Sequence, residues 1–310
     1  MSLYYKSFFF SLLIIFTSVV QSQSLPSFEL NSDWMMSIES LVKMQQKIPV
    51  NKQKKVLIFS LHTGYRHWTI PHTQAVMEII AKSTGAFEVS LSKDITDFEK
   101  NELSKYDVVI LNNNCSKGER RDLFWDVLGE DSSSTENQRL KKAKQLERNL
   151  IQFVKDGNGL ILLHGGIVMQ NYSLAFSDMS GGSFSYHPPQ QEIHVKLVDS
   201  EHPMVEGFDP EGFVHYDEPY FFNNAYFKYN FRPLLYMELD KIKMKRKRPS
   251  DNIKYISWIK RHGKGRVFYS SPSHNAHSYE NPKLLQFLTN GLYYVSGLLT
   301  CDDSPMGHVK

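Results

Sequence analysis

Apolar and polar residues alternate along the first half of the chain in a pattern typical of a parallel α/β sheet. Short runs rich in Val, Ile and Leu predict buried strands, and apolar positions at helical spacing predict helices between them. The predicted strands cover 55–61, 87–91, 107–111 and 159–163, and the predicted helices cover 72–83, 119–128 and 137–155. A polar stretch at 130–136 predicts an exposed loop between the last two helices. This order implies right-handed crossovers and helices on both faces of the sheet.

From about residue 191 the predicted strands become shorter and alternate apolar with polar positions, which indicates partly antiparallel pairing. They cover 192–198, 213–216, 234–239, 255–260 and 266–269, with a hairpin turn at 263–265. A helix over 282–296, stopped by Gly297, closes the pattern. The simplest architecture is one α/β domain over 54–298 with a mixed, mostly parallel sheet. An extension at 23–53 precedes this domain and a tail at 299–310 follows it.

The first residues read as a secretory signal peptide at 1–22. Lys6 precedes an apolar run over 8–16, and Ser22 ends a stretch suited to cleavage. The run is short for a membrane span, so we expect no stable membrane span after cleavage. The protein is then exported to the periplasm or the extracellular space. An uncleaved N-terminal anchor is the alternative.

Composition and charge exclude few classes of protein. The 41% hydrophobic and 22% charged residues are ordinary for a globular protein, and the formal net charge of +3 gives no argument for nucleic acid as a partner. The two cysteines, Cys115 and Cys301, do not form a disulfide framework, and whether they pair is open. Cys115 follows a predicted strand and is either an inert or disulfide-bonded residue or a reactive thiol near the crevice.

His164 carries the strongest functional signal because it ends the buried run at 159–163 and precedes Gly165 and Gly166. A polar residue at the carboxyl end of a parallel strand lies in the crevice where open α/β sheets bind ligands. In related folds a Ser or Cys nucleophile often occupies this turn. An imidazole there disfavours covalent acyl transfer and favours acid/base, electrophilic or metal-ligand chemistry.

Other polar clusters lie at predicted strand ends or in glycine-rich turns, at 62–67, 112–114, 181–190, 215–219 and 273–279. The clusters at 62–67, 112–114 and 164–166 follow parallel strands and should converge at one edge. Arg66 and His67 either bind a ligand or pack a loop. Asp217 and Glu218 are adjacent, so in a strand only one faces the site. We expect His72 to face solvent on its helix.

Cofactor motifs are absent from the sequence. It contains no His-Glu-x-x-His, Cys-x-x-Cys or EF-hand loop, so a divalent metal remains open without a spacing signal. It also lacks a phosphate-binding Gly-x-x-x-x-Gly-Lys and a Gly-x-Gly-x-x-Gly, which disfavours nucleotide cofactors.

Taken together, the motifs resemble the ThuA-like (trehalose utilisation) family over residues 54–298. The resemblance rests on 61–67 with Ile70-Pro71, 106–110, 159–164, 181–184 with His187-Pro188 and Gln191, His202-Pro203 with Gly207, Asp217-Glu218, Trp258 with 263–269, and His274 with Tyr279 and Pro282. That family is similar in fold to class I glutamine amidotransferases, which have a flavodoxin-like α/β sheet. Its members carry His where those enzymes carry the nucleophilic Cys, which agrees with His164.

The resemblance implies a role in utilisation of disaccharides or 3-keto-glycosides, as a hydrolase, lyase or isomerase and not as a Cys-dependent amidotransferase. We assign catalytic roles to His164, His274, Asp217 and Glu218 and substrate binding to Arg66, His67, Asn112, His187 and Tyr279. By motif matching, all of these except Asn112 and Tyr279 take polar pocket positions of the family. This chain differs from many members at 165–168, where an Asp is absent, at Ser273, where Gly is usual, and at His277, where an acid is frequent. The sugar and the oligomeric state stay open.

Two other functions fit the same sequence. A non-catalytic sugar-binding module would use aromatic stacking surfaces at Tyr65, Tyr186, Tyr216, Tyr220 and Phe221. A thiol enzyme of the amidotransferase type would use Cys115.

Overall fold

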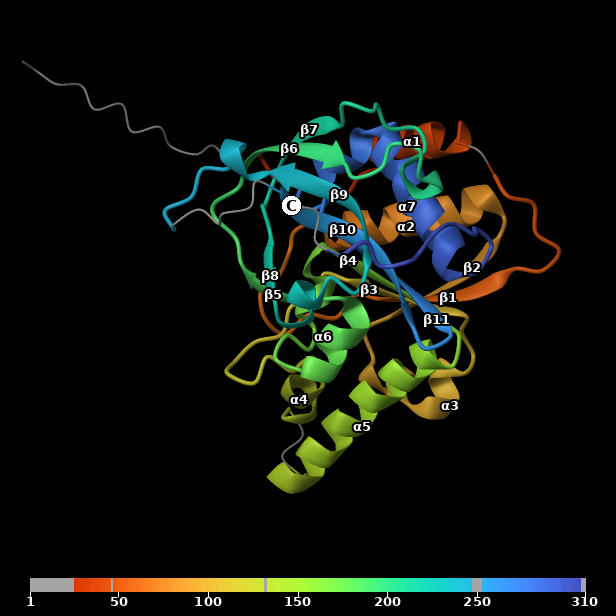
Figure 1. Cartoon of the computed structure of the whole chain (residues 1–310). Coiled ribbons are helices and arrows are strands. Elements are labelled where there is room, and N and C mark those ends of the chain that lie inside the picture. The colour runs from red at the N-terminus through yellow and green to blue at the C-terminus, as the bar shows by residue number, and fades with distance from the viewer. Residues whose placement is uncertain (1–24, 46, 131–132, 247–252, 308–310) are drawn as a thin grey trace, which may run out of the picture.

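Nine strands form one sheet with helices on both faces, as the apolar pattern predicts (Figure 1). The structure is a computed structural model that describes residues 25–45, 47–130, 133–246 and 253–307. The predicted signal peptide at 1–22 lies outside the described residues. The strand order is β2-β1-β3-β4-β11-β10-β9-β6-β7.

The strand bounds follow the predicted apolar runs closely. They are β1 Lys54–Phe59, β2 Phe87–Ser92, β3 Val108–Asn112, β4 Gly159–Leu163, β6 Gln191–Leu197, β7 Phe213–Asp217, β9 Arg232–Glu238, β10 Ile253–His262 and β11 Gly265–Ser270. A separate two-stranded sheet pairs β5 (Ser183–Tyr186) with β8 (Phe221–Asn223), and sequence reasoning did not predict it.

Strand direction explains why several polar clusters meet at one edge. The pairs β2–β1, β1–β3, β3–β4 and β4–β11 are parallel, and the pairs from β11 to β7 are antiparallel. Four successive antiparallel steps restore the original direction, so β7 runs parallel to β11. The carboxyl ends of β1, β3, β4, β11 and β7 therefore point to the same edge.

Helices cover the two faces of the sheet separately. The helices α1 (Ser32–Lys43), α2 (Ile70–Thr84) and α7 (Pro282–Val295) lie on one face. The helices α3 (Lys100–Leu103), α4 (Leu123–Leu128), α5 (Glu136–Lys155) and α6 (Leu174–Ser180) lie on the other. Short 3₁₀ turns cover Ile95–Phe98, His164–Val168, Pro203–Val205, Asn224–Lys228, Leu239–Lys241 and Ala276–Glu280.

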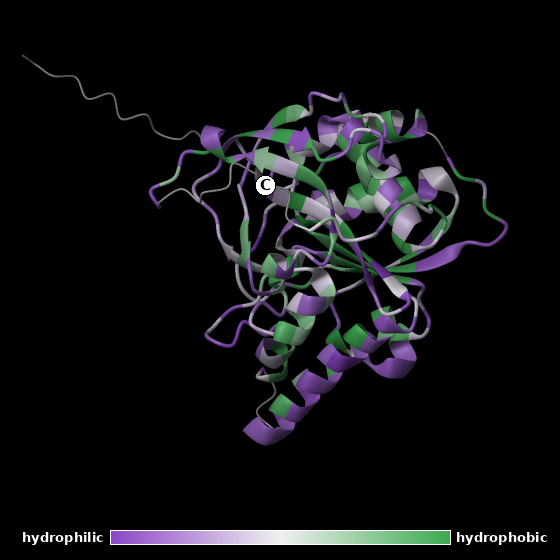
Figure 2. Cartoon of the chain, viewed as in Figure 1, coloured by the Kyte–Doolittle hydropathy of each residue, from purple (hydrophilic) through white to green (hydrophobic). Residues whose placement is uncertain are grey.

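Successive side chains of the central strands point to opposite faces of the sheet, so the protein has one hydrophobic core on each face. In β4, Ile161 and Leu163 face the core under α1, α2 and α7, whereas Leu160 and Leu162 face the core under α4, α5 and α6. Hydrophobic residues fill the central strands, and α5 presents a mostly hydrophilic surface outward (Figure 2). A sheet that is buried on both faces leaves its edges and strand ends as places for polar chemistry.

Two sequence expectations are wrong. The helix predicted over 119–128 begins only at Leu123, because Asp122 caps it and Arg121 has φ +48°, outside the helical region. His72, expected to face solvent, is 1% exposed. Its helix is covered by an element that sequence reasoning did not predict.

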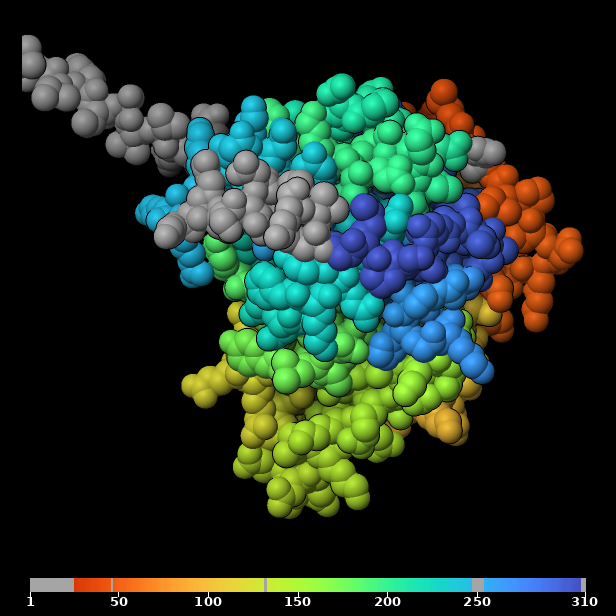
Figure 3. Space-filling view, in the orientation of Figure 1, coloured from red at the N-terminus to blue at the C-terminus, as the bar shows by residue number. Residues whose placement is uncertain are grey.

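That element is α1, within the predicted extension at 23–53. Asn31 caps α1, and Trp34, Ile38 and Val42 bury one face of it against the body. The red-orange N-terminal segment packs beside the blue C-terminal helix α7 (Figures 1 and 3). Trp34 lies edge-on to His72 with ring centroids 5.1 Å apart.

Within the described residues, no helix combines the length and the apolar character needed to cross a membrane.

His72 should make stability depend on pH. Burial lowers the pKa of His72 below its ordinary value. The unfolded chain then binds a proton more readily than the folded chain, so stability is lost as pH falls below about 6.5. We expect His72→Phe, which keeps an aromatic ring against Trp34, to lose less thermal stability than wild type between about pH 7 and about pH 5. Thermal unfolding at both pH values measures this. The control is His194→Phe at a partly exposed surface position, which should keep the wild-type loss. An equal loss in His72→Phe contradicts the prediction.

Candidate functional site

His164 stands at the carboxyl end of β4, as predicted, in a left-handed backbone conformation with φ +44°. The two glycines after it are required by close packing. A Cβ on Gly166 would lie 2.4 Å from the carbonyl oxygen of Leu111, and a Cβ on Gly165 would lie 2.8 Å from Sγ of Cys115. Asn113 fixes the same turn, because its side-chain oxygen accepts the backbone N–H of Gly165 at 3.1 Å. The clusters after β1, β3 and β4 therefore converge, as expected.

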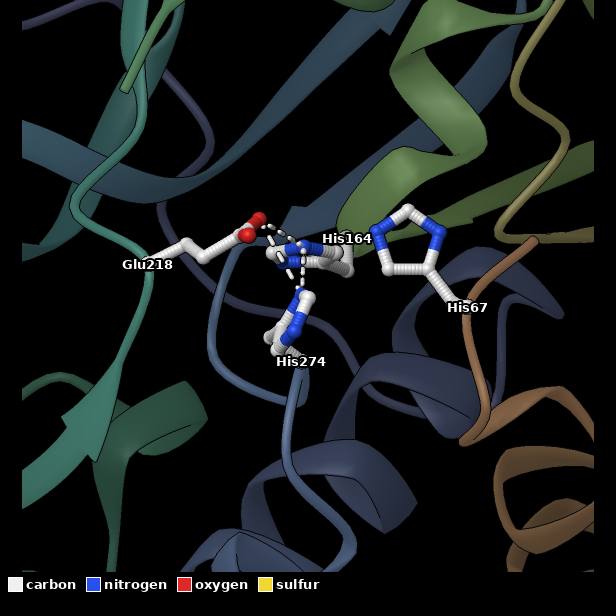
Figure 4. A group of neighbouring side chains, drawn as sticks. All are labelled: His67, His164, Glu218 and His274. Carbon is white, nitrogen blue, oxygen red and sulfur yellow. Dashed lines mark hydrogen bonds and ion pairs between the residues drawn. The ribbon is translucent and has the colours of Figure 1, made fainter. Parts of the chain in front are cut away.

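Asp217 and Glu218 have different tasks. The Asp217 carboxylate accepts the backbone N–H groups of Glu218, Ser273 and His274 at 2.7–3.2 Å. It therefore holds the loop after β11 against the end of β7. The Glu218 side chain points the other way, toward the histidines (Figure 4). Of the two acids, Glu218 is the one in contact with the histidine cluster.

Three side-chain atoms form a small triangle at the centre of this site. Oε2 of Glu218 lies 3.2 Å from Nε2 of His164 and 3.1 Å from Nδ1 of His274. Nδ1 of His274 lies 3.4 Å from Nε2 of His164. His67 joins the group from the loop after β1, and one ligand atom from each of the four residues lies within 4.8 Å of the others (Figure 4). All four residues are buried.

Polar contacts outside the triangle orient the rings. Nδ1 of His164 lies 2.7 Å from the carbonyl oxygen of Ser271, so Nδ1 carries the proton that it donates. Nε2 of His274 contacts the side-chain amide of Gln190 at 2.8 Å. The Tyr220 ring lies 4.2 Å from the His164 ring, centroid to centroid.

The charges in the triangle balance one another. Burial would raise the pKa of Glu218, but its hydrogen bonds with His164 and His274 outweigh burial and hold the pKa well below the usual range. Burial would lower the pKa of His164, but the hydrogen bond to Glu218 and the charges of Asp217 and Glu218 raise it. For His67, burial and the neighbouring His164 and His274 lower the pKa well below its ordinary value. The site thus favours an ionised carboxylate next to a cation, with His67 neutral.

A cavity of ≈ 390 Å³ opens beside the triangle. Glu218 and His67 contribute to its lining, and His164 and His274 contact Glu218 from outside that lining. The lining residues are Tyr65, His67, Cys115, Arg121, Val168, Phe184, His187, Glu218 and Tyr220. A larger cavity of ≈ 650 Å³ lies by α3, α5 and α6, away from this cluster. We place the candidate site at the smaller cavity because the buried ionisable groups gather there.

The structure brings together five of the predicted site residues: His67, His164, His187, Glu218 and His274. The four others are elsewhere. Asp217 accepts backbone N–H groups of the loop after β11 and does not line the cavity. Arg66 is exposed and does not line the cavity either. Asn112 donates to Oγ of Ser60 and to the carbonyl of Ile70, and the Tyr279 hydroxyl pairs with Thr73 at 2.7 Å. Their contacts are structural, and substrate binding by Arg66, Asn112 or Tyr279 stays a prediction.

Sequence reasoning missed Arg121, Val168 and Phe184 in the cavity wall. Arg121 lay inside a helix predicted over 119–128. The signal that places it in a loop is Asp122, a helix-capping residue whose side chain accepts the backbone N–H of Trp125. The side chain of Arg121 donates to the carbonyl oxygen of Ser116 at 2.8 Å.

Both cysteines are free. Cys115 lines the cavity, but burial raises the pKa of its thiol to about 12. A thiol with that pKa is protonated at neutral pH, which opposes a nucleophilic role for Cys115.

Comparison with known proteins gives one family. The model of the ThuA family, described as trehalose utilisation, matches residues 55–295. A ThuA-like protein from Bacteroides uniformis ATCC 8492 is 17% identical with a TM-score of 0.59, over 80% of this chain and 93% of that one. A ThuA-like protein from Parabacteroides merdae ATCC 43184 is 16% identical with a TM-score of 0.54, over 82% and 98%. At this identity the likeness shows a shared fold. No curated protein matches the chain.

Ser273 should lower stability through backbone strain. Its φ of +132° is a conformation that residues with a Cβ rarely adopt, and the N–H group of Ser273 is fixed by Asp217 at 2.8 Å. We expect Ser273→Gly to raise the free energy of unfolding by about 1 kcal/mol, because relief of strain exceeds the added flexibility of the unfolded chain. Denaturation in urea measures this. Ser273→Ala, which keeps the Cβ, should show no gain; a gain as large as that of glycine would assign the effect to the hydroxyl group.

Proposed function

The chain belongs to the ThuA family, described as trehalose utilisation, and from that premise we propose that it is an enzyme acting on a disaccharide or a 3-keto-glycoside. The observation that carries the proposal is the buried His164–Glu218–His274 triangle beside a cavity of ≈ 390 Å³. That volume lies within the range typical of small-molecule sites. The family supports a role in carbohydrate utilisation, and the triangle supports chemistry in addition to binding.

Buried charge favours an enzyme over a binding module. Burying a carboxylate costs free energy unless hydrogen bonds and opposite charges compensate it. A module that binds neutral sugars needs hydrogen-bonding groups and aromatic surfaces but has no need of such a carboxylate. Strongly shifted pKa values in a group of residues beside a cavity are typical of catalytic sites.

His187 is placed to exchange a proton with a bound sugar. Its Nδ1 lies 2.8 Å from the carbonyl oxygen of Pro188, so Nδ1 carries a proton and Nε2 of the neutral ring carries a lone pair. Nε2 lies 3.6 Å from Oε1 of Glu218, and 35% of the His187 side chain is exposed. Hydrolases, lyases and isomerases of sugars all move protons on oxygen or on carbon next to a carbonyl group. A keto group in the sugar makes the neighbouring C–H acidic, and an imidazole with a free lone pair can accept that proton.

A non-catalytic sugar-binding module is the second candidate. Tyr65 is 61% exposed and lines the cavity together with Phe184 and Tyr220. Exposed aromatic rings at a cavity mouth suit stacking on the apolar faces of sugars. The other predicted stacking residues, Tyr186, Tyr216 and Phe221, do not line the cavity. The aromatic wall serves either function.

We also propose export to the periplasm or beyond. The support is in the first residues, with Lys6 before an apolar run at 8–16 and a stretch suited to cleavage that ends at Ser22.

Turnover by the chain from Gln23 tests the enzyme proposal. On a panel of disaccharides and their 3-keto forms, we expect wild type to form product. We expect His164→Ala and Glu218→Gln to lose at least about 100-fold in rate, because both changes remove a member of the triangle. The control is His194→Ala, since His194 forms a surface contact with Glu192 at 3.1 Å, of nearly the same length as that of His164 with Glu218.

Sugar binding by wild type without product over long incubation would favour the binding module. Product formation that is equal in wild type and in both triangle variants would remove the triangle from the chemistry.

A further inference from the structure

We propose that the chain binds one divalent transition-metal ion, Zn²⁺ or Mn²⁺, through Nε2 of His164, Nδ1 of His274 and the carboxylate of Glu218, with His67 beside these three ligands (Figure 4). The chemistry of the ion rests on the proposed function, but ion binding itself is measurable without a sugar. Imidazoles with one carboxylate are a donor set of catalytic transition-metal sites, whereas Ca²⁺ and Mg²⁺ prefer oxygen ligands.

The size of the triangle fits such an ion. Metal–ligand bonds of about 2.0–2.2 Å at angles between about 90° and about 109° separate neighbouring ligand atoms by about 2.8–3.6 Å. The three edges measure 3.1, 3.2 and 3.4 Å. These atoms come from three separate segments, after β4, β7 and β11, yet each is as close to the other two as ligands of one ion are.

The orientation of the His164 ring also supports metal binding. Its Nδ1–H donates to the carbonyl oxygen of Ser271, so Nε2 is the ring nitrogen that faces the triangle and is free to bind an ion in place of a proton. A backbone carbonyl on the far nitrogen is the usual arrangement that orients a metal-binding imidazole and fixes its tautomer. Oε2 of Glu218 presents lone pairs 3.2 Å from that nitrogen. At that distance either a proton on Nε2 or a bound metal ion must lie between the two atoms.

Glu218 also differs from a structural acid. Asp217, its neighbour, accepts three backbone N–H groups and so has a role in the fold. Among the described residues, the recorded polar contacts of the Glu218 carboxylate are all with imidazoles, those of His164, His187 and His274. An acid surrounded by imidazoles contributes little to backbone geometry and much to cation binding.

A metal on Nδ1 of His274 leaves the ring proton on Nε2, which must then face a hydrogen-bond acceptor. The Gln190 amide nitrogen faces Nε2 of His274 at 2.8 Å, and the amide oxygen accepts a hydrogen bond from Asn275 at 3.0 Å. Metal binding requires the Gln190 amide to turn by half a rotation, so that its oxygen accepts a proton from Nε2. That turn gives up the hydrogen bond with Asn275, which makes Gln190 a positioning residue for metal affinity.

The ion would face the substrate, because Glu218 and His67 also line the cavity. When bound, a divalent ion there polarises a hydroxyl or keto oxygen of a sugar. The protein supplies the proton-transfer group in His187 and the stacking surface in Tyr65.

Metal analysis of the purified chain from Gln23 tests the proposal. Elemental analysis after growth with Zn²⁺ and Mn²⁺ should find one ion per chain. After removal of the ion with a chelator, calorimetric titration with each metal should return one site. We expect Glu218→Gln, close to wild type in shape, and His164→Ala to weaken binding by more than about 100-fold. His194→Ala, from the surface pair, should bind as wild type does, and Gln190→Glu should bind at least as tightly, because a carboxylate accepts the Nε2 proton without turning.

Thermal unfolding guards against variants that fail to fold. Added metal should raise the unfolding temperature of wild type and His194→Ala but leave that of a folded Glu218→Gln unchanged. Absence of binding and of any thermal shift in wild type, or equal binding by wild type and the triangle variants, overturns the metal site. Turnover without metal would leave the enzyme proposal standing alone, and metal binding without turnover would leave the metal site standing alone.

Discussion

The buried carboxylate of Glu218 is the constraint on which the rest of the site depends. It is 7% exposed, and an isolated charge at that depth would neutralise itself or unfold its surroundings. Its polar neighbours are imidazoles, so the compensation must come from a proton on one of them or from a bound cation. Either solution requires His164 and His274 to hold their rings within hydrogen-bonding distance. The backbone at or next to both histidines accordingly adopts conformations that are rare for residues with a Cβ.

Two residues with positive φ and one carboxylate produce this backbone geometry. His164 itself has φ +44°, and Ser273, which precedes His274, has φ +132°. Strained backbone persists only where surrounding contacts over-determine it, and Asp217 supplies those contacts for the loop of His274 through the N–H groups of Ser273 and His274. The two adjacent acids thus divide the work. Asp217 fixes the geometry, and Glu218 supplies the charge, because successive residues of an extended chain point to opposite sides.

The sequence predicted the sheet, the helices on both faces and the importance of His164, because these depend on local periodicity and on one rule about strand ends. It left Asp217 and Glu218 undecided, since alternation says that they differ but not which way the strand turns. It missed Arg121 in the cavity wall, because the helix start after Asp122 depends on a single side-chain cap. It missed α1 and so expected His72 in solvent. The signal was present in Asn31 followed by Trp34, Ile38 and Val42, but the partner surface of α1 is formed by residues far along the chain.

A proton and a divalent ion meet the same electrostatic need at Glu218, which is why residue types alone left acid/base and metal chemistry as alternatives. Geometry separates them. Protons on Nε2 of His164 and Nδ1 of His274 can both be donated to Oε2 of Glu218, but they then face each other across the 3.4 Å that separates the two nitrogens. A divalent ion instead binds all three atoms at once, and the 3.1–3.4 Å between these atoms are separations expected of ligands around one ion. The hydrogen bond between Gln190 and Asn275 opposes the ion, because it holds the Gln190 amide in the orientation that keeps the proton on Nδ1. The balance between proton and metal is therefore set at Gln190, a residue outside the triangle.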